Sequence, residues 1–343
     1  MPDPSILNLK GKIGNSTELD AIANPSLQYL GMFVRNIEAT TKELSSIWGI
    51  NSWETLEFAP PQSAVRVGSA FKVKMAKANL LGLSFHIYAP VDDLDTFAKS
   101  SPVWGRFLKH STGGIQHICV SVDNWDEVVA KIVERGGKVY KSGSYDGRRW
   151  AHVDGEVGNC VVAIEERTQL AATIEEAIGI SKVKGKVGNS RLDAIAKPSL
   201  QHMGVYVKDL DAFMRYMTKV WGIDEWETLE FAPPPDTMRA GKAFRLYMAN
   251  ANLFGVLLHV SQRADDLDTF GRAVAVWAQY ERTAGEGLYH ICVSVNNWEK
   301  VVDTVKARGA NLFASSSYEG RRWAHFYCPV SNLNVEIEER VKP

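Results

Sequence analysis

The 343-residue chain contains one sequence pattern twice, at a constant spacing (226 − 53 = 173). Three segments return 173 residues later: Trp53–Pro61 as Trp226–Pro234, His117–Val122 as His290–Val295, and Gly147–His152 as Gly320–His325. Such a repeat indicates two tandem units of one fold, and about 170 residues are enough for each unit to bury its own core. Each copy is therefore a control for the other. Residues that agree are explained most simply by the fold, and polar residues that differ mark a gained or lost site.

The repeat also predicts the domain organisation. We predict an N-terminal domain over residues 1–167, a linker over residues 168–198 that carries Lys, Gly, Asn and Ser, and a C-terminal domain over residues 199–343.

The composition excludes several classes of function. A net charge of −1 creates no basic field that would attract nucleic acid or an anionic membrane. Four cysteines are too few and too scattered for a disulfide framework or a structural zinc site. No signal peptide is evident at the start, and no apolar run is long enough to span a bilayer, so we expect a cytoplasmic protein.

A second, shorter period lies inside each half. Strand-like and helical runs follow in the order strand, helix and three strands, and this order then starts again. In the first half the predicted strands are 27–34, 52–58, 70–75, 80–88, 115–122, 138–140, 149–153 and 160–164, and the predicted helices are 37–48 and 125–135. The pattern predicts an α+β protein made of four βαβββ modules.

The first strands of the four modules carry a ring side chain in one register, namely Tyr29, His117, His202 and His290. Together with the module order, this pattern resembles the vicinal oxygen chelate superfamily, the glyoxalase–bleomycin resistance–extradiol dioxygenase fold, over nearly the whole chain. Each half is most similar to methylmalonyl-CoA epimerase, through Ala89-Pro90 after the fourth strand and the histidine that opens the fifth. The resemblance implies two tandem glyoxalase-like domains, each a curled mixed sheet that forms a cup for a divalent metal.

The resemblance also implies a metal site in the C-terminal half. The positions that match the family's ligands are His202, His259, His290 and Glu336. The epimerase usually has glutamine at the second of these positions, so His259 departs from it. Imidazoles and one carboxylate suit divalent Fe, Mn, Co, Ni or Zn. Strand alternation is consistent with this set, because it turns Glu336 and Glu338 away from the apolar positions of the last strand.

The N-terminal half differs at two of these four positions. Its counterparts are Tyr29, His86, His117 and Ala163, so the first histidine and the carboxylate are absent there. We therefore expect one metal ion per chain, in the C-terminal half, and a degenerate N-terminal site. Pairing of modules across the halves stays open; it would create the sets His86, His290 and Glu336, and His117, His202 and His259.

Two reactions on a small, oxygen-chelating substrate fit the expected centre. The one that we favour is an isomerase, epimerase or lyase reaction in which the metal stabilises an enolate. Arg245 occupies the place of the family's general base on the third strand. Because arginine is no base at neutral pH, we expect Arg245 to face the cup and bind an anionic part of the substrate. Glu230 and Glu338 are the replacement bases.

The alternative is ring cleavage by an Fe(II) extradiol-type dioxygenase. An inactive first half joined to a second half with two histidines and a glutamate is typical of that group. Glu336 would then serve the catalytic centre as a ligand, His259 as an acid–base group and Tyr327 in substrate binding, although residues 326–332 lack the group's signature spacing. A third hypothesis is a metal-free protein that binds a small molecule. Assembly into a homodimer stays open.

Overall fold

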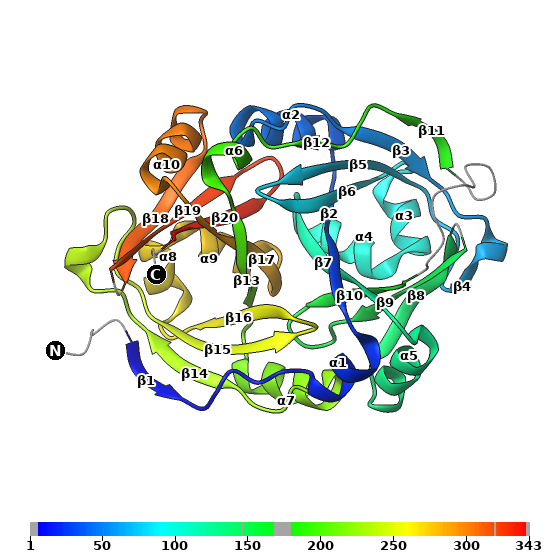
Figure 1. The fold of residues 1–343 in the computed structure, drawn as a ribbon, viewed down its shortest axis with the longest axis horizontal. Helices are drawn as coiled ribbons and strands as arrows, with labels where there is room; N and C mark the ends of the chain where they lie inside the picture. The colour runs from blue at the N-terminus through cyan, green and yellow to red at the C-terminus, as the bar shows by residue number, and fades with distance from the viewer. Residues whose placement is uncertain (1–5, 146, 168–179, 319, 341–343) are drawn as a thin grey trace.

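The computed structural model describes residues 6–145, 147–167, 180–318 and 320–340. Two curled sheets lie beside each other, and each is built mainly from one half of the chain (Figure 1). The modules pair within each half, because the first strands of a half's two modules are neighbours in its sheet. The predicted α+β fold of four βαβββ modules in two tandem glyoxalase-like domains is confirmed.

The elements of the N-terminal half follow the predicted order twice. They are β2 (Ser26–Val34), α2 (Ile37–Trp48), β3 (Glu54–Phe58), β4 (Val65–Val67), β5 (Val73–Leu80), β6 (Leu83–Pro90), α3 (Leu94–Ser100), α4 (Pro102–His110), β7 (Gly113–Val122), α5 (Trp125–Glu134), β8 (Lys138–Tyr145), β9 (Arg148–Asp154) and β10 (Val161–Glu166).

The C-terminal half repeats this order, except that residues 238–240, the counterparts of β4, form only an isolated bridge at Ala240. Its elements are β13 (Ser199–Tyr206), α7 (Leu210–Trp221), β14 (Glu227–Phe231), β15 (Leu246–Leu253), β16 (Val256–Arg263), α8 (Leu267–Ala273), α9 (Ala275–Thr283), β17 (Gly287–Val295), α10 (Trp298–Ala307), β18 (Asn311–Tyr318), β19 (Arg321–Cys328) and β20 (Leu333–Glu339). The strand order β16-β13-β17-β20-β19 places both first strands at the centre of the sheet.

Local sequence explains where the repeated helices begin and end. The side chain of Asn36 accepts a hydrogen bond from the Ala39 N–H and caps α2, and Asp209 caps α7 in the same way through Ala212. Helix α2 ends at Gly49 and helix α7 ends at Gly222. Both glycines have a positive φ, which is 69° at Gly222.

Several features differ from the sequence-based expectations, and β1, α1 and β4 are among the elements that were not predicted. The third strand of the first module runs over 73–80 rather than 70–75, because 70–72 form the approach to the strand. The helix pairs α3–α4 and α8–α9 between modules were not predicted, and Figure 1 shows them within the curves of the two sheets. The predicted linker contains β11 (Ile180–Lys184), β12 (Gly188–Asn189) and α6 (Asp193–Ala196), while residues 168–179 lie outside the described part.

The two halves exchange their leading strands. Strand β1 (Ile6–Lys10) pairs with β14 of the C-terminal sheet, and its repeat counterpart β11 pairs with β3 of the N-terminal sheet. Helix α1 (Thr17–Ala23) follows β1 and contacts α5. The exchange adds main-chain hydrogen bonds between the halves and covers a strand edge in each sheet.

Side-chain contacts join the halves further. The Trp48 indole N–H approaches the Cys328 sulfur at 3.4 Å, and Glu43 accepts hydrogen bonds from the N–H groups of Val330 and Ser331 at 2.9 and 2.8 Å. The largest cluster of buried apolar residues contains members of both halves, so the core is continuous across them. Within the described residues, no helix is long and apolar enough to cross a membrane.

Candidate metal centre

Polar side chains form one row across the concave face of the C-terminal sheet. His202 on β13 is the register partner of Cys292 on β17, and Cys292 is the partner of Glu336 on β20. Glu336 is in turn opposite His325 on β19. Because facing residues of paired strands point to the same side of a sheet, the register alone brings these side chains together. His290 lies two residues before Cys292 on β17 and faces the same side.

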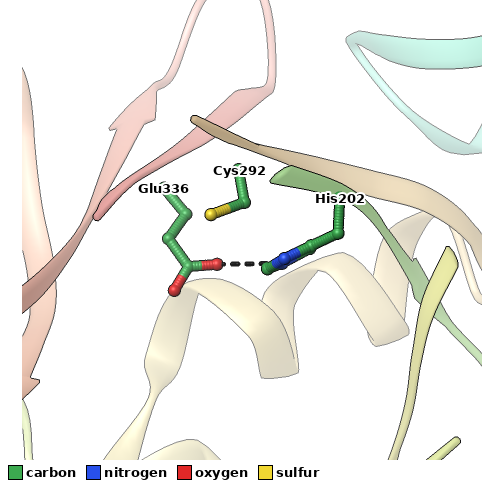
Figure 2. A group of neighbouring side chains, drawn as sticks. All are labelled: His202, Cys292 and Glu336. Carbon is green, nitrogen blue, oxygen red and sulfur yellow. Dashed lines mark ion pairs between the residues drawn. The ribbon is translucent and has the colours of Figure 1, made fainter. Parts of the chain in front are cut away.

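Two imidazoles and one carboxylate meet within hydrogen-bonding distance. The Nε2 atoms of His202 and His290 lie 3.0 Å apart, and each lies 3.2 Å from Oε2 of Glu336. Figure 2 shows the Glu336 carboxylate turned toward the His202 ring, with the Cys292 sulfur beside them. The side chains of His202, His290 and Glu336 are buried, so their Nε2 and Oε2 atoms have little access to bulk water.

The buried environment controls the protonation of these groups. Burial disfavours ionisation of Glu336, but His325, His202 and His290 outweigh burial and hold the pKa of its carboxyl well below the usual range. Burial lowers the pKa of His290 to about 3, against the opposing effect of Glu336. A charged carboxylate beside a neutral imidazole is the protonation state in which these groups bind divalent metals.

The donor set fits a divalent cation. Ligand atoms about 2.1 Å from one ion and at right angles to each other lie about 3.0 Å apart, which is close to the three observed separations. Two histidines and one carboxylate on one side of an ion, with the other positions open, form the facial triad of non-haem iron sites. His202, His290 and Glu336 are therefore the residues that could hold the metal.

Cys292 is the fourth neighbour of this group. Its sulfur, a His202 nitrogen and a Glu336 oxygen all lie within 4.8 Å of one another. Burial, followed by the nearby charge of Glu336, raises the pKa of the Cys292 thiol well above its usual value. The thiol therefore favours its protonated form, and Cys292 is not among the residues that line the cavity described below.

His259, the other histidine expected as a ligand, lies next to the three. Its ring packs against that of His202 with centroids 4.4 Å apart, and it lines the same cavity. Burial and the neighbouring His202 lower the pKa of His259 well below its usual value, so the ring is neutral. The structure thus places His259 beside the triad, where it can contact a substrate.

Two other expected site residues lie away from the cup. Arg245 was expected to face the substrate, but it precedes β15 on the exposed side and binds Asp265 at 3.1 Å and Glu230 at 3.4 Å. Leu246, the first residue of β15, lines the cup. Because successive side chains of an extended chain point to opposite faces, Arg245 points away from the cup. Tyr327 is half-buried near the end of β19, where its hydroxyl donates to Oδ1 of Asn332 at 2.9 Å.

His325 is the site residue that the sequence reasoning missed. Its Nε2 lies 3.5 Å from Oε1 of Glu336, and its Nδ1 lies 3.3 Å from Oδ1 of Asn334. His325 belongs to the repeated Gly-Arg-Arg-Trp-Ala-His segment, and its counterpart His152 makes it look like a residue kept by the fold. Only the pairing of β19 with β20, which the local sequence does not reveal, places His325 opposite Glu336.

A cavity of about 330 Å³ is lined by His202, His259, His290, His325 and Glu336, and this size suits a small organic ligand. Aromatic and apolar side chains form most of its wall: Leu229, Phe231, Phe244, Leu246, Met248, Trp277, Tyr289 and Trp323. Asn250, Ser261 and Glu338 add polar groups. Burial, followed by the charge of Glu336, raises the pKa of Glu338.

The comparisons with known proteins agree with this architecture. The family model described as the glyoxalase/bleomycin resistance protein/dioxygenase superfamily matches residues 17–153 and 201–328. A comparison with curated protein sequences found no match.

Two solved structures are similar in fold. A triple mutant of 4-hydroxymandelate synthase from Streptomyces coelicolor has a TM-score of 0.57 and 12% identity, with 93% of each chain covered. A fusion of a xylose isomerase-like TIM barrel with 4-hydroxyphenylpyruvate dioxygenase has a TM-score of 0.52 and 10% identity, over 92% of this chain and 49% of the fusion. The repeated family match covers most of the sequence, and the chain belongs to the glyoxalase/bleomycin resistance protein/dioxygenase superfamily.

Proposed function

We propose that the protein is a mononuclear Fe(II)-dependent dioxygenase. Its substrate is a small aromatic compound that carries oxygen atoms on two adjacent carbon atoms. The observation that carries this proposal is the convergence of His202, His290 and Glu336, with donor atoms 3.0 to 3.2 Å apart, at the base of an aromatic cup. This donor set is the one that non-haem iron oxygenases use.

His202, His290 and Glu336 would hold the iron. A bound Fe(II) would offer open coordination positions to the substrate oxygens and to O₂, and the electrons that reduce O₂ would come from the substrate. The protein contributes a buried site whose carboxylate is ionised and whose His290 ring is neutral, so the ligands need no costly change of protonation before they bind.

The cavity wall supports an aromatic substrate. Phe231, Phe244, Trp277 and Trp323 offer ring faces and edges around a space of about 330 Å³. Catechols and 2-oxo acids both present two neighbouring oxygen atoms. The two similar structures are a 4-hydroxymandelate synthase and a 4-hydroxyphenylpyruvate dioxygenase fusion, so 4-hydroxyphenylpyruvate is the first 2-oxo acid to test.

Glu338 is the group proposed to move a proton, and His259 is the group proposed to hold a substrate hydroxyl. The ring of His259 lies beside His202, and because its pKa is lowered it stays neutral and can accept a hydrogen bond from that hydroxyl. Glu338 lines the cavity, and its raised pKa makes its carboxyl a better proton carrier near neutral pH than an exposed glutamate.

Glu338 also favours a second candidate, the isomerase or lyase reaction through a metal-stabilised enolate. That reaction needs a general base, and a buried carboxyl with a raised pKa can take this role. Arg245 does not help this candidate, because it is paired with Asp265 outside the cup.

An oxygen electrode separates the two candidates. Protein purified without oxygen and loaded with Fe(II) should consume O₂ with 4-hydroxyphenylpyruvate or with a catechol, and His290→Ala should abolish this uptake. His117→Ala, the same change in the N-terminal half, is the control and should retain the uptake. Absence of uptake across both substrate classes, with iron still bound, would overturn the dioxygenase proposal in favour of the enolate reaction.

A further inference from the structure

The N-terminal half contains its own cup, which the proposed chemistry does not use. The cavity measures about 360 Å³, close to the 330 Å³ of the C-terminal cup. Its wall repeats the aromatic residues of the other cup: Phe58, Phe71, Trp104 and Trp150 stand where Phe231, Phe244, Trp277 and Trp323 stand in the C-terminal half. The shape that receives a ring is therefore kept in both halves.

The metal-binding residues of this second cup are replaced. Ala163 stands in the place of Glu336 and has no donor atom. Tyr29 stands in the place of His202; its ring stacks on His86 with centroids 3.7 Å apart, and its hydroxyl donates to Oε1 of Glu165 at 3.0 Å. The N-terminal cup has kept a cavity and lost the triad.

Several polar atoms of this cup lack a partner among the described residues. Nδ1 of His117 lies 2.8 Å from the amide oxygen of Gln116, which can only accept, so Nδ1 carries the proton. Nε2 of His117 is then a hydrogen-bond acceptor, and it is buried and unpaired. The buried indole N–H groups of Trp104 and Trp150 are also unpaired, but so are those of their counterparts Trp277 and Trp323, so the His117 nitrogen is the more informative atom. Buried polar atoms of this kind are costly unless something satisfies them.

The charges in this cup are small or balanced. Burial lowers the pKa of His117 to about 3 and the pKa of His152 well below its usual value, so both rings are neutral. Burial raises the pKa of Glu165, Lys77 is paired with Glu54 at 3.1 Å, and Arg149 is paired with Glu166 at 2.6 Å. Arg148, the other arginine of the lining, is exposed. The two neutral imidazoles suit an uncharged ligand.

We propose that the N-terminal cup is a second, metal-free binding site for a single-ring phenol. The aromatic wall receives the ring, the phenol O–H donates to Nε2 of His117, and the phenol oxygen can accept from an indole N–H. This inference does not depend on the proposed reaction, because its site shares no residue with the triad.

Calorimetric titration of the metal-free protein with 4-methylphenol tests the site. We expect binding with a Kd of about 1 mM or tighter. The matched probe 4-methylanisole keeps the ring and the oxygen atom but lacks the O–H, and it should bind about tenfold more weakly, which is the loss of one good hydrogen bond.

Variants locate the bound phenol. His117→Phe removes the acceptor and Ala163→Phe fills the cup, and both should remove the site. The repeat counterparts supply the controls: Trp277→Phe and Glu336→Ala alter only the C-terminal cup and should leave the site intact. Metal binding by the C-terminal half and far-ultraviolet circular dichroism report whether each N-terminal variant is folded.

Four outcomes would overturn the proposal. The first three are absence of 4-methylphenol binding to the wild-type protein, equal binding of 4-methylanisole, and binding that survives both His117→Phe and Ala163→Phe. The fourth is loss of the site in Trp277→Phe, which would place the phenol in the C-terminal cup. Oxygen uptake by the iron-loaded enzyme is measured separately, so failure here leaves the dioxygenase proposal unaffected.

Discussion

The His290 imidazole lies directly against the backbone of Gly204 on the neighbouring strand. A Cβ atom at Gly204 would lie 2.0 Å from Cε1 and from Nδ1 of that ring, a separation that real structures do not contain. Gly31 and His117 repeat this relationship in the N-terminal half, where the Cβ would lie 2.0 Å from Cε1. The glycine allows the ring to lie across the adjacent strand, where its Nε2 reaches Glu336.

Gly204→Ala should therefore displace His290 and weaken metal binding. We expect affinity to fall about 10- to 100-fold, as it does when a residue that orients a ligand is lost. The overpacking should also reduce the free energy of unfolding by about 1–3 kcal/mol. Metal titration and thermal unfolding measure both effects. Gly31→Ala is the control: it should destabilise the fold to a similar extent without a change in metal affinity, and equal loss of metal in both variants would contradict this account.

Glu336→Ala should remove the bound metal, because it leaves two imidazoles and recreates the alanine of the other half. Wild-type protein should contain one equivalent per chain by elemental analysis. His117→Ala should keep that equivalent, since His117 belongs to the N-terminal cup. Two equivalents in the wild-type protein, or metal retained in Glu336→Ala, would show that the site is assigned to the wrong residues.

The converse change should create a metal site. Tyr29→His together with Ala163→Glu would place two imidazoles and a carboxylate in the N-terminal cup, where His117 already occupies the place of His290. We expect the second equivalent of metal to appear only in the double variant. If metal content stays at one equivalent while the protein remains folded, then features beyond the triad decide which cup binds metal.

Arg245→Lys should leave the reaction unchanged. Arg245 is half-exposed and bound to Asp265 and Glu230, and exposed ion pairs of this kind contribute about 0–1 kcal/mol. Steady-state kinetics with the substrate that drives oxygen uptake should show kcat and KM within about twofold of the wild-type values. A KM that rises severalfold with kcat unchanged would mean that Arg245 does bind the substrate.

Lys141 should make stability depend on pH. Its buried ammonium donates to the Ser100 carbonyl at 2.9 Å and to Oγ of Ser101 at 2.8 Å, and burial lowers its pKa from 10.5 to about 8. Between pH 8 and 10.5 the unfolded chain binds more protons at this site than the folded chain, so stability rises with pH across that window.

Comparison with Lys141→Met isolates this contribution. From pH 8 to 10, the free energy of unfolding of the wild-type protein should rise relative to that of Lys141→Met, by at most about 3 kcal/mol. Urea unfolding at a series of pH values measures the difference. A difference that stays constant with pH would mean that the buried amine keeps its ordinary pKa.

The sequence by itself determined the repeated fold and the positions of the candidate ligands. The repeat and the alternation of apolar and polar residues are local properties, so they predicted the βαβββ modules, the helix over 37–48 and the side of the last strand that carries Glu336. The contrast between the copies identified His202 and Glu336 as the pair that the N-terminal half lacks, and the structure places their side chains 3.2 Å apart.

Only the tertiary structure decided which side chains meet. Pairing of modules within a half, exchange of β1 and β11, and the register of β19 on β20 all depend on contacts between residues far apart in sequence. For that reason His325 was missed and Arg245 was expected in the cup. A shift of one residue moves a side chain to the opposite face of a sheet, and this register is set by the packing of whole strands rather than by local pattern.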